Sequence, residues 1–333
     1  MRRRDFISLI GIAIAWPFAS LAQQVSKVHH IAIVHPTQRM MMESESRAFF
    51  AELQRLGYVE GINLTVDRFS LEGQIDFKGP IREAIRRGPE VILTLGSDMA
   101  AALQEATRSI PIVAAVVDPI VTGLTVSISR PGGNLTGVVI DAGVNVWEKR
   151  FEVLREIIPA GLRVAFLAAP DVREGPYGQA VQQAADRVGI SLTFITYDDP
   201  VHGAGYRDEA GYRGAFLAMR DAGIGAIAIP DEPGDLAHRK LIVELVQDLR
   251  LPAVYPFREF IDEGGLMAYS PNLPELSRHA AHQVEQILKG ANPGDLPFFQ
   301  ATKFELTINL KTARALGITV PPSLLARADE VIE

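Results

Sequence analysis

Short apolar runs without polar alternation recur along the chain and are separated by segments with apolar residues at helical spacing. Val91–Leu95 is typical of a strand buried on both faces of a sheet, and Ile112–Val117 is a second such run. Between them, Asp98–Arg108 carries helix formers after Ser97, which we expect to cap the helix. These segments predict a βαβ unit with a right-handed crossover.

The strands of this unit end in small or polar residues rather than in further apolar ones. Gly96 and Ser97 follow the first strand, and Asp118 follows the second. Ligands of open α/β sheets bind in the crevice outside the carboxyl ends of the strands, so we place these residues in a ligand site. Ser97 would offer a hydroxyl and the free N–H groups of a helix N-terminus to a ligand carboxylate.

The same alternation continues on both sides of this unit. Further strands are expected at Val28–Val34, Asn63–Phe69, Leu135–Ile140, Arg163–Leu167, Ser191–Tyr197, Ala226–Ile229, Ala253–Tyr255, Leu266–Tyr269 and Phe304–Leu310. Further helices are expected at Met40–Leu56, Asp76–Arg87, Val146–Ile158, Tyr177–Val188, Ala210–Ala222, Leu236–Leu249, Leu273–Lys289 and Lys311–Leu316. The rhythm restarts near Asp141–Trp147, so the pattern predicts an α/β fold of two doubly wound, parallel-sheet lobes.

Neither predicted lobe is a single stretch of chain. The C-terminal region carries one strand–helix set more than the second half needs, so we expect the chain to return to the first lobe near Gly264. The first lobe would comprise residues 27–141 and about 265–300. The second would comprise 142–264, with 301–333 added if the chain crosses again before Phe304. Two or three crossings would form a multi-strand hinge, and a hinge between two α/β lobes can close around a ligand.

Other polar residues lie where they would face the same crevice. The carboxylate of Asp231 follows a strand and could accept hydrogen bonds from an ammonium or hydroxyl group, and tyrosines supply flat surface with a polar tip. The predicted ligand site therefore contains Ser97, Asp118, Asp231, Tyr269, Gly96, Tyr177 and Thr37. Structural roles compete with this one, because serine can simply cap a helix, aspartate can close a turn, and a tyrosine in a strand can belong to the core.

The first 22 residues have the pattern of an export signal. Arg3-Arg4-x-Phe-Ile matches the twin-arginine motif, Ile7–Trp16 is apolar but too short to span a bilayer, and Ser20-Leu21-Ala22 suits cleavage. An uncleaved membrane anchor is the alternative. With cleavage near Ala22 we expect a periplasmic protein without stable membrane insertion.

Composition and missing motifs narrow the function. The net charge is −7 and becomes −9 without the export signal, which argues against a nucleic-acid partner. The chain has no cysteine, which excludes thiol catalysis, disulfides and cysteine-bound metals. It also lacks the dinucleotide-binding, P-loop, nucleophile-elbow and zinc-protease motifs. We therefore expect no cofactor, no metal site, no catalytic residues and no enzyme activity.

Several runs resemble one protein family. They are GYVEGIN (57–63), RPGGNLTG (130–137), LPAVYP (251–256), GGLMAY (264–269), TKFELTINLKTA (302–313) and PPSLLARADE (321–330). On these runs the sequence is similar to the ABC-transporter substrate-binding proteins of the tryptophan-binding-like group, over nearly all of the chain after the export signal.

The resemblance implies a type I periplasmic-binding-protein fold that captures a small solute between its lobes. It implies delivery of that solute by a monomer to an ABC permease and its ATPase, and known ligands of the group include aromatic amino acids. The strand ends at Gly96-Ser97, Asp118, Asp231 and Tyr269 fall where such clefts hold their ligands. One departure is Asp98, whose carboxylate would compete with a ligand carboxylate at the helix N-terminus or would bind an amine.

The leading hypothesis is the solute-binding component of an ABC transporter for a small polar or amphipathic solute, amino acids and aromatic ones included. Two alternatives stay open. One is an exported α/β enzyme such as a periplasmic oxidoreductase. The other is a ligand-sensing protein of the same fold that is coupled to a receptor.

Overall fold

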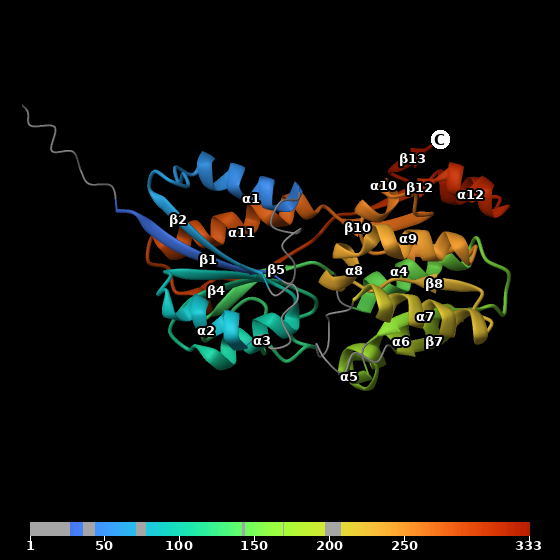
Figure 1. The fold of residues 1–333 in the computed structure, drawn as a ribbon. Helices are drawn as coiled ribbons and strands as arrows, with labels where there is room; N and C mark the ends of the chain where they lie inside the picture. The colour runs from blue at the N-terminus through green and yellow to red at the C-terminus, as the bar shows by residue number, and fades with distance from the viewer. Residues whose placement is uncertain (1–26, 36–43, 71–77, 142–143, 169, 197–207) are drawn as a thin grey trace, which may run out of the picture.

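The computed structural model describes residues 27–35, 44–70, 78–141, 144–168, 170–196 and 208–333. Two lobes lie side by side, and each is built on its own sheet (Figure 1). The strand orders are β2-β1-β3-β4-β5-β11 and β7-β6-β8-β9-β10-β12-β13. In both sheets the first strand of the lobe lies between the second and the third, which is the flavodoxin-like doubly wound order. The predicted α/β fold with a repeated topology is therefore confirmed.

The first sheet is parallel throughout and has a helical layer on each face. Its strands are β1 (His29–His35), β2 (Leu64–Ser70), β3 (Val91–Leu95), β4 (Ile112–Val116), β5 (Leu135–Val139) and β11 (Phe299–Gln300). Helices α1 (Ser44–Arg55) and α11 (Leu273–Leu288) pack on one face, and α2 (Lys78–Arg86) and α3 (Ser97–Ala106) pack on the other (Figure 1). Cover on both faces explains why these strands are continuous apolar runs.

The second sheet has the same doubly wound core and one strand more than the first. Its strands are β6 (Arg163–Ala168), β7 (Ser191–Thr196), β8 (Ala226–Ala228), β9 (Ala253–Tyr255), β10 (Met267–Pro271), β12 (Phe304–Asn309) and β13 (Glu330–Ile332). Helices α4 (Val144–Arg155) and α6 (Pro176–Val188) pack on one face, and α7 (Glu209–Asp221) and α9 (Arg239–Asp248) pack on the other. The shorter helices are α5 (Pro170–Glu174), α8 (Pro233–Ala237), α10 (Glu259–Asp262), α12 (Leu310–Leu316), α13 (Pro322–Leu325) and the 3-10 turn η2 (Pro293–Asp295).

The chain crosses between the lobes after β5, after β10 and after β11. The second crossing lies later than the position near Gly264 that the sequence suggested, because β10 still pairs with β9 in the second sheet. Gly264, with φ of 100°, instead ends α10, and the N–H of Gly265 bonds to the carbonyl of Phe260. The chain returns from the first lobe as β12, which runs antiparallel to β10.

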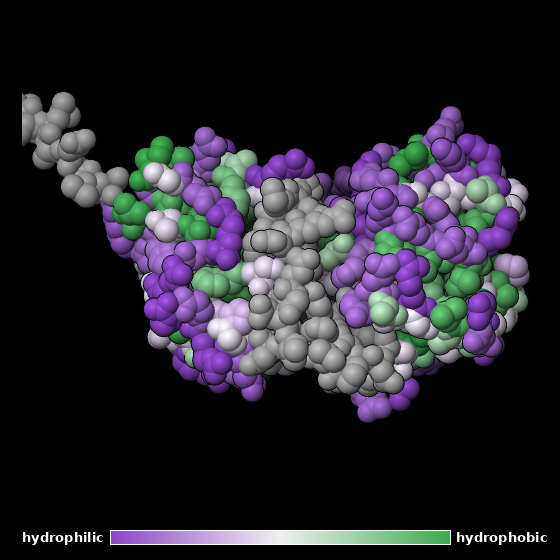
Figure 2. All heavy atoms as spheres, viewed as in Figure 1, coloured by the Kyte–Doolittle hydropathy of each residue, from purple (hydrophilic) through white to green (hydrophobic). Residues whose placement is uncertain are grey.

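Polar residues cover most of the outward surface of both lobes in the view of Figure 2. The apolar residues gather in the four helix–sheet layers and at the junction of the lobes, where Val138 and Ile140 of the first lobe share a cluster with Leu236 and Phe257 of the second. The fold thus places an apolar contact zone at the carboxyl ends of the first sheet.

Candidate functional site

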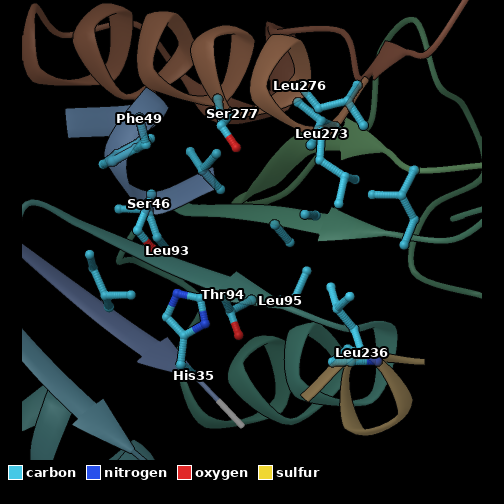
Figure 3. Close-up of a pocket in the computed structure, with 18 of the residues that line it drawn as sticks. His35, Ser46, Phe49, Leu93, Thr94, Leu95, Leu236, Leu273, Leu276 and Ser277 are labelled. Carbon is cyan, nitrogen blue, oxygen red and sulfur yellow. The ribbon is translucent and has the colours of Figure 1, made fainter. Parts of the chain in front are cut away.

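A cavity of about 130 Å³ lies at the junction of the lobes (Figure 3). Alternate residues at the ends of four strands form its floor, because side chains two positions apart share one face of a sheet. They are Ile33 and His35, Leu93 and Leu95, Val113 and Ala115, and Val138 and Ile140. The helices α1 and α11 cover this floor with residues at helical spacing, among them Phe49, Phe50, Leu273, Leu276 and Ser277.

The second lobe closes the cavity with the segment that follows β8. Asp231, Pro233 and Leu236 line it together with Phe257. The gap between β1 and β3 in the first sheet and the gap between β6 and β8 in the second are the points where the strand order reverses. Ligands of doubly wound sheets bind at such points. The cavity is apolar with a small number of polar groups, which is the usual make-up of a small-molecule site.

A fully buried ion pair stands at the second-lobe edge of the cavity. Nη1 of Arg150 lies 2.6 Å from Oδ2 of Asp231, and both side chains are at most 1% exposed. The guanidinium also donates to the carbonyls of Tyr269 and Pro256, and it lies 4.6 Å from the Trp147 ring centroid. Arg150 therefore joins the segments after β8 and β9 to the middle of β10, and it fixes the orientation of the Asp231 carboxylate.

The other oxygen of this carboxylate has a different environment. Oδ1 of Asp231 is buried, and no donor of the described residues bonds to it. Because a buried polar atom without a hydrogen bond costs free energy, such an atom in a cavity wall is suited to accept an N–H or O–H from a ligand.

Tyr177 and Trp147 extend the network away from the cavity. Nε1 of Trp147 donates to Oη of Tyr177 at 2.8 Å, and that hydroxyl lies 3.4 Å from Oδ2 of Asp231. Burial, and then the negative charge of Asp231, raise the pKa of the Tyr177 phenol well above its usual value. The phenol therefore stays neutral and can donate to the carboxylate.

The loop after β3 carries Gly96 and Ser97 to the second lobe. Gly96, with φ of 101°, is the N-cap of α3, so the prediction that Ser97 caps the helix is wrong. Ser97 is the first helical residue, and its Oγ is buried without a hydrogen-bond partner among the described residues. A β-carbon on Gly96 would lie 3.3 Å from Cγ of Pro233, so the backbone here touches the segment after β8.

Replacing Gly96 with alanine is expected to lower the free energy of unfolding by about 1–2 kcal/mol, because alanine is strained at a positive φ. Urea unfolding measures the change. Gly79→Ala is the matched control, since Gly79 lies within a helix with open space around it and should tolerate alanine or gain stability. Equal effects of the two substitutions would contradict this explanation.

His35 ends β1 and lines the cavity. Its Nδ1 is buried and has no hydrogen-bond partner among the described residues. Burial lowers the pKa of its ring from 6.5 to about 4, because the charged form loses its solvation. The imidazole is therefore neutral at pH 7.

This lowered pKa links stability to pH. Between pH 6.5 and pH 4 the unfolded chain binds a proton at His35 that the folded protein does not, so stability is lost as the pH falls through this window. We expect the His35 contribution to fall by about 2 kcal/mol between pH 7 and pH 5. Urea unfolding of the wild type and of His35→Leu at both pH values isolates this contribution. Parallel losses in both proteins would contradict the assignment.

Of the predicted site residues that the structure describes, Asp231 alone lines the cavity, and Gly96, Ser97 and Tyr177 do not. Asp118 and Tyr269 have other contacts. Oδ1 of Asp118 accepts hydrogen bonds from the N–H groups of Ile120 and Val121, so this carboxylate holds a turn, and Asp118 does not line the cavity. The ring of Tyr269 stacks on Phe304 with centroids 5.5 Å apart, and its carbonyl accepts from Arg150. Thr37 lies outside the described residues.

The sequence analysis missed Arg150 and His35. Arg150 had a visible signal, because it lies three residues after Trp147 and four before Leu154, on the apolar stripe of its helix. An arginine at such a position needs a buried anion. His35 had only the weaker signal of a polar residue at a strand end.

Within the described residues, no group of three or more histidine, aspartate or glutamate side chains is arranged to hold a metal ion. No helix in that part of the chain is long and apolar enough to cross a membrane.

Two doubly wound lobes, several chain crossings and a cavity at the junction define a binding protein of the type I periplasmic class. The family model described as ABC transporter substrate binding protein matches residues 30–332, so the chain belongs to that family. This is a family of solute-binding proteins rather than enzymes, and its members typically work outside the cytoplasm.

Individual relatives are distant in sequence but similar along most of their length. A tyrosine-binding protein of Clostridioides difficile is 20% identical over 294 residues, which are 88% of this chain and 82% of that protein. A conserved domain protein from Vibrio cholerae has a TM-score of 0.80 and 23% identity, covering 92% of this chain and 100% of the other. An ABC domain in complex with L-Trp from Streptococcus pneumoniae has a TM-score of 0.75 and 20% identity, covering 91% and 99%.

Proposed function

We propose that this protein captures a small amphipathic solute, an amino acid with an apolar and in particular an aromatic side chain, and delivers it to an ABC permease. The observation that carries the proposal is Oδ1 of Asp231, a buried carboxylate oxygen with no partner among the described residues, at the edge of an apolar cavity. An apolar cavity binds a hydrocarbon side chain, and the carboxylate adds a site for a polar head group.

Each end of an amino acid has a matching group. The ammonium donates to Oδ1 of Asp231, and the side chain enters the cavity beside Leu93, Leu276 and Phe257. The carboxylate accepts from Ser97 Oγ and from backbone N–H groups in the first turn of α3. Asp98 in the first turn of α3 is exposed, so solvent and salt screen its charge and weaken its competition with the ligand carboxylate.

The charge of the ion pair also favours a zwitterion. Arg150 and Asp231 neutralise each other within the protein, so a ligand with net charge would bring an uncompensated charge to a buried site. A zwitterionic amino acid adds no net charge. The binding of tyrosine and of L-Trp by the two relatives supports the same ligand class.

The family and the export pattern of residues 1–22 support a cellular location and a set of partners. We propose that the signal is cleaved near Ala22 and that the protein works in the periplasm as a monomer. Its partners there are the permease and the ATPase that drives it.

A fluorescence titration tests the proposal. Trp147 is the only tryptophan after residue 22, it is buried, and it is linked to Asp231 through Tyr177. We expect saturable emission changes and a higher melting temperature with one or a few aromatic amino acids in a panel of amino acids, sugars and polyamines. The absence of both signals with every amino acid would contradict the proposal, and a response to sugars or polyamines alone would replace the ligand class.

A further inference from the structure

His35, in the cavity wall, has a polar atom that makes no contact with the amino-acid ligand as placed above. His35 projects from the end of β1 into the cavity (Figure 3), and its lining neighbours Ile33, Leu93 and Leu95 are apolar. Its Nδ1 is buried, and the described residues offer it no hydrogen bond. Thr94 also lines this wall, but its hydroxyl already donates to the carbonyl of Val34 at 3.1 Å.

An unpaired nitrogen at this position is costly for the protein. A carbon in its place would avoid the loss of hydration that an unbonded imidazole nitrogen suffers on burial. Buried polar atoms without partners are rare in folded proteins, and each calls for an explanation such as a functional role. No hydrogen bond through Nδ1 to a described residue gives this ring nitrogen of His35 a structural role.

The charge state of the ring selects the matching ligand group. The imidazole is neutral at pH 7, so one ring nitrogen donates and the other accepts. A hydroxyl both donates and accepts, and it therefore complements Nδ1 in either tautomer. An ammonium or a carboxylate at this point would place an uncompensated charge among apolar side chains.

The size of the cavity limits the size of the ligand group that bears this hydroxyl. Its volume of about 130 Å³ is similar to that of a cavity known to hold benzene, which is about 150 Å³. The space therefore fits one six-membered ring with a small substituent.

We propose that His35 is a specificity-determining residue that hydrogen-bonds a hydroxyl at the distal end of the ligand, so that the cavity prefers phenolic side chains to the corresponding hydrocarbons. The inference deepens the proposed function and rests on it only for the placement of the amino-acid backbone at Asp231. The preference of the cavity for a phenol over a hydrocarbon ring does not depend on the proposed function.

The test uses two matched pairs of probes on the purified protein without residues 1–22. Phenol and benzene probe the cavity alone, and L-tyrosine and L-phenylalanine probe the whole site. Affinities are measured by ligand-observed NMR and calorimetry for the wild type, His35→Leu and His35→Gln. His282→Leu is the control, because His282 is a half-exposed histidine that pairs with Glu52.

We expect the wild type to bind phenol and L-tyrosine roughly 10- to 100-fold more tightly than benzene and L-phenylalanine. His35→Leu should abolish this preference by weakening the hydroxylated member of each pair, His35→Gln should keep part of it, and the control should keep all of it. Because the leucine removes an unpaired polar atom, the His35→Leu protein should melt at a higher temperature, which separates the loss of binding from misfolding.

The outcomes separate the two proposals. Equal affinity for phenol and benzene, binding of neither, or equal weakening of both by His35→Leu would overturn the role of His35, even where amino acids bind. A preference for phenol that depends on His35, found together with no binding of any amino acid, would support the role of His35 and overturn the proposed function.

Discussion

Replacing Arg150 with methionine is expected to lower the free energy of unfolding by about 3–5 kcal/mol. The substitution leaves the carboxylate of Asp231 buried without its cation, and it removes the hydrogen bonds to the carbonyls of Pro256 and Tyr269. Urea unfolding monitored by circular dichroism measures the loss. The effect is large because neither charge can reach water without opening the second lobe.

A double substitution separates the charge from the packing. In Arg150→Met with Asp231→Leu no charge remains buried, so stability should recover most of the loss. Arg155→Met is the control on the same helix, because Arg155 is exposed and, among the described residues, donates to the carbonyl of Val188 alone. If the double variant were as unstable as Arg150→Met, the loss of stability would come from the packing of the arginine rather than from its charge.

Replacing Asp231 with asparagine is expected to weaken ligand binding by about 2–4 kcal/mol, roughly 30- to 1,000-fold in Kd. The variant keeps the shape of the side chain but loses the charge that we propose attracts the ligand ammonium. Calorimetry at a temperature well below the unfolding transition measures Kd for folded protein.

Asp221→Asn is the matched control for this experiment. Asp221 lies in the same lobe, and its side chain is 68% exposed beside Arg220, so its charge should not influence the ligand. Unchanged affinity in Asp231→Asn would remove the carboxylate from the proposed site. A loss limited to ligands that carry an amino group would identify the ammonium as its partner.

Most of the fold could be predicted from the sequence, because each buried strand and amphipathic helix has a strong local pattern. The elements that were missed are short. β11 has two residues and β13 three, so no periodicity can develop, and their pairing depends on strands already in place. The expected helix Leu236–Leu249 is divided at His238, where α8 ends.

The position of the second crossing was mispredicted for a related reason. A glycine pair such as Gly264-Gly265 marks a turn but does not tell which lobe follows. The pairing of β10 with β9 is decided by contacts that are distant in sequence.

The candidate site was predictable only in part. Asp231 was predicted as a site residue because Pro230-Asp231 follows the apolar run Ala226–Ile229, and residues after such strands face the crevice. Its partner Arg150 is 81 residues earlier in the chain, and the packing of α4 against β9 and β10 brings the two charges together. His35 likewise lines a cavity that α1 and α11 cover, and these helices pack on β1 from two distant parts of the chain. Local patterns identify where strands end but not which of the residues there become enclosed.

The position of α11 has a consequence for how the molecule is made. This helix supplies Ala281, Val284 and Ile287 to the layer that packs on Ile31 and Ile33. A nascent chain leaves the ribosome from its N-terminus, so the first half is synthesised long before its own covering helix. The sheet of the second lobe is likewise incomplete until β12 and β13 have been synthesised. Both lobes therefore complete their folding only after most of the chain has been synthesised. A single cut in the polypeptide cannot release either lobe as an intact fragment.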